Sequence, residues 1–236
     1  MPGSVTSVET SPQILTYVFS VFGLVTSLMF TTVGYVNNEW IVLRNSYNLG
    51  EVQRGIRGHD CYKNITADEG SIKCLPWEFK PKSSKFPEPF DTIKDPSNLI
   101  YWSQYTAIII FICQFAWLAY AIAQCCSSKA ADYLKKHKLN LYRLYFATLF
   151  LFVLLYIFIQ AALYFSEFFP FPMDESKWDK VFGSGLKTFL FGGLAPMLIA
   201  FICLFKEELR VAWNQLSFIC FRRRHQPLPN NETEMH

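Results

Sequence analysis

The chain has 236 residues, of which 51% are hydrophobic and 17% aromatic, and its formal net charge is +3. The apolar residues are gathered into four long runs, which is typical of a membrane protein and excludes an ordinary soluble domain. Each run approaches the roughly 20 residues that a helix needs to cross a hydrocarbon core about 30 Å thick. We therefore predict an all-α membrane protein with four transmembrane helices, at residues 14–36, 101–124, 144–165 and 182–205.

The first run, at 14–36, follows a short N-terminal segment, 1–13. It has no basic segment before it and is too long for the apolar part of a signal peptide, so we expect it to stay in the mature protein. Lys and Arg concentrate in 125–143 and in 206–236, and such loops usually face the cytoplasm. The sequence thus predicts a multi-pass plasma-membrane protein with both termini in the cytoplasm.

The outer segment 37–100 is rich in short stretches with strand character. These are Glu39–Arg44, Gly50–Tyr62 and Ser71–Phe79, separated by glycines and followed by prolines. We expect them to form a small extracellular antiparallel sheet. A helix capped by residues 95–98 then continues into the second span.

Two cysteines and a glycosylation acceptor lie in this outer segment. Of the seven cysteines only Cys61 and Cys74 fall outside the predicted spans and cytoplasmic ends, so they form a predicted disulfide, with two free thiols as the alternative. Closing this loop would contribute roughly 3 kcal/mol. Asn64, in Asn-Ile-Thr, would carry a glycan at the tip of the hairpin between them.

A family pattern runs through the same segment. Trp40 just after the first span, the pair Gly55-Ile56, then Cys61 and Cys74, resemble the claudin, peripheral myelin protein and epithelial membrane protein superfamily. That resemblance implies a sheet from the first loop, completed by a strand from the second. Arg57 stands where the family has a second Trp, which suggests a divergent relative. Trp40 has an alternative role as an anchor at lipid headgroup level.

The second outer segment, 166–181, contains the aromatic side chains Phe168, Phe169 and Phe171 beside prolines. These are a candidate contact loop, which either meets a partner, as the second loop does in claudins, or dips into lipid.

Polar residues are rare inside the spans, and charged ones rarer, which argues against a transport path. Gln114 and Gln160 are expected to hydrogen-bond between helices.

On the cytoplasmic side, 206–236 begins with an amphipathic stretch that ends in three arginines, Arg222–Arg224, and is expected to lie on the anionic inner leaflet. Cys125, Cys126 and Cys220 are candidate palmitoylation sites, with unmodified thiols as the alternative.

No catalytic, cofactor or metal motif emerges: the four histidines are scattered, and there is no Gly-rich phosphate loop. We expect a non-enzyme without cofactor or nucleic-acid partner. Its expected partners are membrane lipid and other membrane proteins. The protein partners are either copies of itself, in cell–cell contact at junctions or in lateral assembly within one membrane, or a channel or receptor. In the second case the chain would be an auxiliary subunit.

Overall fold

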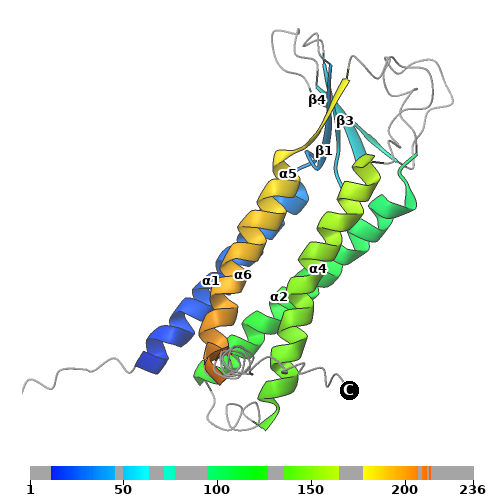
Figure 1. Ribbon diagram of the computed structural model, residues 1–236. Coiled ribbons are helices and arrows are strands. Elements are labelled where there is room, and N and C mark those ends of the chain that lie inside the picture. The colour runs from blue at the N-terminus through cyan, green and yellow to red at the C-terminus, as the bar shows by residue number, and fades with distance from the viewer. Residues whose placement is uncertain are drawn as a thin grey trace, which may run out of the picture.

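The protein consists of four long apolar helices and a small antiparallel sheet at one end of them (Figure 1). The computed structural model describes residues 12–45, 50–63, 72–77, 95–126, 136–164, 178–206, 209–211 and 213. In this part of the chain four helical segments are long and apolar enough to cross a membrane. The predicted combination of a four-helix membrane bundle with a small sheet is therefore present.

The first three spans are each a single helix. They are α1 (Pro12–Val36), α2 (Asn98–Cys126) and α4 (Lys138–Tyr164). Helices α2 and α4 begin three and six residues before the predicted spans, at 101 and 144, because a helix continues past its apolar run wherever the flanking residues can form its hydrogen bonds. At α2 the Ser97 carbonyl accepts the first of these bonds, from the backbone of Ile100.

The fourth span is built from three consecutive segments, α5 (Ser184–Lys187), the π-helical turn η3 (Thr188–Gly192) and α6 (Gly193–Leu204). Pro196 lies inside α6 and has no N–H to donate to the carbonyl of Gly192, where the π turn ends. The irregular winding thus lies next to the residue that interrupts the helical hydrogen bonds.

Helix α1 approaches the fourth span closely, and small residues permit this. A Cβ on Gly34 would lie 2.5 Å from the backbone nitrogen of Phe189, and one on Gly23 would lie 2.8 Å from the carbonyl oxygen of Pro196. Helices in lipid gain from such backbone proximity, since lipid gives little hydrophobic force between them.

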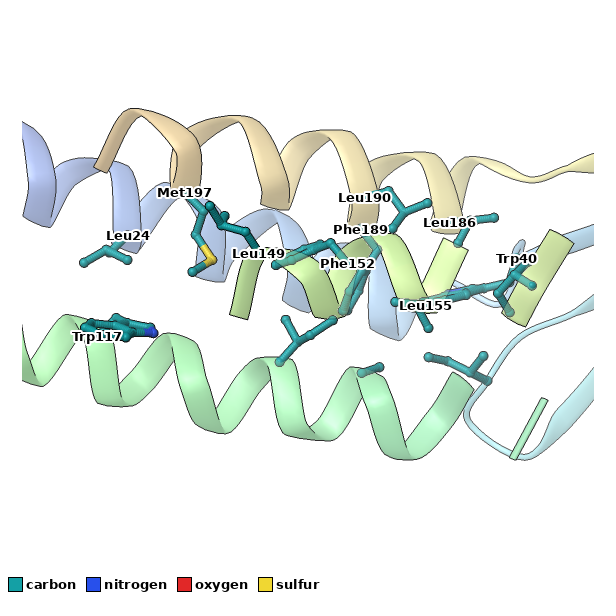
Figure 2. Packing of buried hydrophobic residues seen from close by; sticks show 14 of the residues in the cluster. Leu24, Trp40, Trp117, Leu149, Phe152, Leu155, Leu186, Phe189, Leu190 and Met197 are labelled. Atoms are coloured by element: carbon teal, nitrogen blue, oxygen red, sulfur yellow. The ribbon is translucent and has the colours of Figure 1, made fainter. Parts of the chain in front are cut away.

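The centre of the bundle is filled by large apolar side chains. Figure 2 shows them in a continuous layer from Leu24 and Trp117 at one end to Leu186 and Trp40 at the end beside the sheet. Phe152 and Phe189 meet in the middle, with ring centroids 5.9 Å apart.

One polar cluster interrupts this layer. Gln114 of α2 donates to the Ser27 hydroxyl at 2.8 Å and accepts from the Thr31 hydroxyl at 3.0 Å, both on α1. Ser27 in turn donates to the carbonyl of Gly193. The predicted interhelical bonding of Gln114 is confirmed, whereas Gln160 lies exposed on the surface of α4.

The sheet has five strands in the order β4-β3-β2-β1-β5, and all pairs are antiparallel. Its strands are β1 (Ile41–Asn45), β2 (Glu51–Arg54), β3 (His59–Lys63), β4 (Ile72–Pro76) and β5 (Trp178–Phe182). The predicted extended stretch at 50–62 is two strands, because the turn at Gly58, with φ of 89°, reverses the chain.

The last strand comes from the second outer segment. β5 pairs with β1, so that Val42 lies opposite Val181 and Ile41 opposite Phe182. Phe182 was expected to begin the fourth helix but ends this strand. The N–H of Gly183 donates to the Trp40 carbonyl at 3.0 Å, which keeps the chain extended until the helix begins at Ser184.

The predicted disulfide between Cys61 and Cys74 is formed. The two residues face each other across β3 and β4, so the bond joins neighbouring strands. Asn64 and the rest of the connection between these strands lie outside the described residues.

Replacing Cys61 by Ser is expected to lower the free energy of unfolding of the outer sheet by roughly 2 to 5 kcal/mol, because the unfolded loop is no longer closed. Thermal unfolding of the purified protein and its delivery to the cell surface measure this. Cys113→Ser is the control, since that thiol is free within α2. Unchanged stability and normal delivery of a Cys61→Ser, Cys74→Ser double variant would contradict the prediction.

Candidate functional site

The junction between the bundle and the sheet contains most of the residues singled out by the family pattern. Trp40 lies between α1 and β1 and is fully buried. Its indole N–H donates to the Gly34 carbonyl at 2.8 Å, and its ring lies 5.2 Å from that of Phe189. Trp40 thus packs inside the junction and not against lipid headgroups.

The hydrogen bond from Trp40 pairs a backbone carbonyl at the C-terminal end of α1. The last carbonyls of a helix have no partner within it. In α1 the final backbone bond runs from Asn37 to Val33, so Gly34 is the next carbonyl in need of a donor. The Trp40 indole supplies that donor.

Gly55 and Ile56 meet the same junction from the other side. Ile56 is fully buried in the core. A side chain on Gly55 would collide with the amide of Asn38, which explains the glycine at this position. The Asn38 amide nitrogen lies within 3.3 Å of the carbonyls of Gln53 and His59, and 3.1 Å from the sulfur of Cys61.

Glu39 connects the sheet to the fourth span, and the sequence analysis missed it. Its carboxylate accepts hydrogen bonds from the Gln53 amide and from the hydroxyl of Ser184. Its backbone carbonyl accepts from Gly185 at 2.9 Å. The polar run Asn37-Asn38-Glu39 directly before Trp40 is the signal that could have found this connection.

A buried ion pair lies across β2 and β3. Arg54 donates to both carboxylate oxygens of Asp60, at 2.7 and 2.8 Å, and its side chain is 1% exposed. Bidentate pairs of this kind fix geometry as well as charge. The sequence analysis missed this pair also, because only the strand register places the two residues opposite each other.

Several predicted site residues cannot be placed. Asn64, Phe168, Phe169, Phe171 and Cys220 lie outside the described residues, and the side chains of Cys125 and Cys126 are also outside them. Among the residues that are described, no three His, Cys, Asp or Glu side chains are grouped so as to hold a metal ion.

Comparison of the chain with models of known families gives no match, and comparison with curated proteins gives none either. Among the charged groups described at the junction, Glu39 links the sheet to the fourth span, whereas Arg54 and Asp60 pair with each other within the sheet.

Asp60→Asn is expected to lower the free energy of unfolding by about 3 to 5 kcal/mol, because it leaves the Arg54 charge buried without its partner. Glu51→Gln is the matched control in the same sheet. It removes a pair whose Arg44 side chain is 62% exposed, and should cost at most about 1 kcal/mol. Thermal unfolding of the purified variants measures both.

Replacing the whole pair, by Arg54→Met with Asp60→Leu, should recover most of that loss, since no uncompensated charge remains. Equal destabilisation by Asp60→Asn and Glu51→Gln would show that burial of the pair is unimportant.

Proposed function

We propose that the protein is a divergent member of the claudin, peripheral myelin protein and epithelial membrane protein superfamily, and that its sheet is a contact surface for other membrane proteins. The observation that carries this proposal is the junction. Trp40, Gly55 and Ile56 meet there, beside the linked cysteines, and they hold the sheet in a fixed position over the bundle. A surface held in this way is preorganised for binding.

The shape of the sheet supports contact between copies of the chain. Among the described strands, β4 and β5 each pair on one side only. Strand β4 is largely exposed, with Ile72 55% exposed. An open strand edge of this kind can pair with a strand of another molecule. A glycan on Asn64, next to the end of β3, would restrict the directions from which a second copy can approach.

Gln160 favours a second role, as an auxiliary subunit of a channel or receptor. It lies exposed on α4, in the stretch 149–164, whose other residues are apolar or tyrosine. A polar side chain facing lipid leaves its hydrogen-bonding groups unpaired, whereas a partner helix could pair them. The α4 surface around Gln160 is therefore our proposed site of lateral association.

Gln160→Leu is expected to weaken this lateral association, with a loss of about 1 to 2 kcal/mol for one interhelical hydrogen bond. The protein would be purified from native membranes in mild detergent, and the amount of each stoichiometric companion compared. Val153→Leu, also exposed on α4, is the control.

A channel or receptor that is lost with Gln160→Leu would support the auxiliary role, and loss of a homo-oligomer would support self-assembly. Companions retained equally by all three proteins would contradict association through this surface.

The proposed orientation places the sheet outside the cell and both termini inside. Enzymatic deglycosylation should then change the gel mobility of the wild-type protein and of Asn231→Gln, but not that of Asn64→Gln, because only lumenal acceptors are modified. A glycan at Asn231 would reverse the orientation.

A further inference from the structure

A cavity of about 340 Å³ lies where the sheet meets the first turns of α2. Its walls come from three places in the sequence: the turn between β2 and β3, the end of β4, and the start of α2. The lining residues are Arg57, Gly58, His59, Pro76, Trp77, Tyr101 and Gln104. The hydrogen bonds and the ion pair described above for the junction do not use these side chains.

The polar side chains that line the cavity are rich in hydrogen-bond donors. Arg57, His59, Trp77, Tyr101 and Gln104 all carry N–H or O–H groups, and none of the described residues that line the cavity is acidic. Arg57 is exposed and brings a full positive charge. The lining therefore suits an anion with several acceptor oxygens.

The wall is also held in place. The backbone N–H of Trp77 donates to the Gly58 carbonyl at 2.8 Å, and its ring packs edge-on against Tyr101 at 5.6 Å. On the other side the Arg54 guanidinium lies 6.0 Å from the Trp77 ring. Since the charge of Arg54 is matched by Asp60, Arg57 is the cation left to act in the cavity.

The position of the cavity along the bundle indicates what reaches it. Tyr101 and Gln104 lie on one face of α2, three and six residues after Asn98, where the apolar span begins. Lipid headgroups lie at this level, and Trp and Tyr are enriched there. The phosphate of a phospholipid is the acceptor-rich anion present at that depth.

We propose that this cavity binds a phosphate group, supplied by the headgroup of a phospholipid in the leaflet beside the sheet. Arg57 provides the charge, and the Tyr101 hydroxyl and the Gln104 amide on α2 provide further donors. A soluble phosphate offers the same oxygens, so the source must be separated by experiment. The proposal is independent of which protein partner the sheet or α4 contacts.

The test uses the full-length protein in a mild, phosphate-free, non-ionic detergent, with thermal unfolding as the readout. Dihexanoylphosphatidylcholine, inorganic phosphate and dihexanoylglycerol are titrated separately, the last having the same chains without phosphate. A ligand that binds only the folded state raises the unfolding temperature, and the stabilisation grows with the logarithm of one plus the ratio of the ligand concentration to Kd. We expect the phospholipid to do so and dihexanoylglycerol not to.

Two variants locate the effect. Arg57→Gln is expected to weaken the apparent affinity for the phospholipid about ten-fold, and Tyr101→Phe, which keeps the aromatic ring but removes the O–H, by roughly three- to ten-fold. Arg44→Gln is the matched control, an exposed arginine of the same sheet outside the cavity. The unfolding temperature without ligand shows whether each variant is folded.

Stabilisation by the phospholipid that is lost with Arg57→Gln and kept with Arg44→Gln would support the proposal. Equal stabilisation by inorganic phosphate, with the same dependence on Arg57, would support the phosphate site and assign it to a soluble source. Stabilisation by dihexanoylglycerol alone, or an equal loss in Arg57→Gln and Arg44→Gln, would overturn it.

Discussion

The indole of Trp40 pairs with a carbonyl that α1 cannot satisfy by itself, and the passage from helix to strand depends on this bond. The last turn of a helix leaves backbone C=O groups without partners, and near the hydrocarbon core of a membrane little water is present to hydrogen-bond to them. Here one aromatic side chain pairs the carbonyl and also fills the space above Phe189. The sheet begins directly after it, at Ile41, and so takes its position from the bundle.

The rest of the architecture follows from two demands that membranes impose on helices. Polar groups must be paired inside the bundle, as Gln114 is with Ser27 and Thr31. Backbones must come close, as α1 does to the fourth span at Gly34. The sheet is stabilised differently from the bundle, because a five-stranded sheet of this size has little hydrophobic core of its own. The disulfide and the buried pair of Arg54 and Asp60 supply constraints there.

Much of this could be predicted from the sequence, and the reasons are physical. The length and apolarity of the four runs reflect the thickness of a bilayer, and Cys61 and Cys74 are the two cysteines outside the predicted spans and their cytoplasmic ends. What could not be predicted depends on register. Arg54 meets Asp60, and Ile41 meets Phe182, only once the strands are aligned. The family resemblance implied a strand from the second outer segment but not its residues. β5 is short and continues directly into an apolar run, so Phe182 resembled the start of a helix. The cavity beside Trp77 was beyond prediction for a similar reason, since its walls come from three separate stretches.

The place of β5 in the sheet has a consequence for how the protein is made. β1 lies between β2, which follows it closely in the chain, and β5, which precedes the fourth span. During synthesis the hairpins of β1 to β4 can therefore close early, but one edge of β1 stays open until the third span and the second outer segment have been threaded. The sheet is therefore complete only after the first three spans and the second outer segment have been made. A chain that stops earlier would leave the N–H and C=O groups of β1 unpaired on the side that β5 covers.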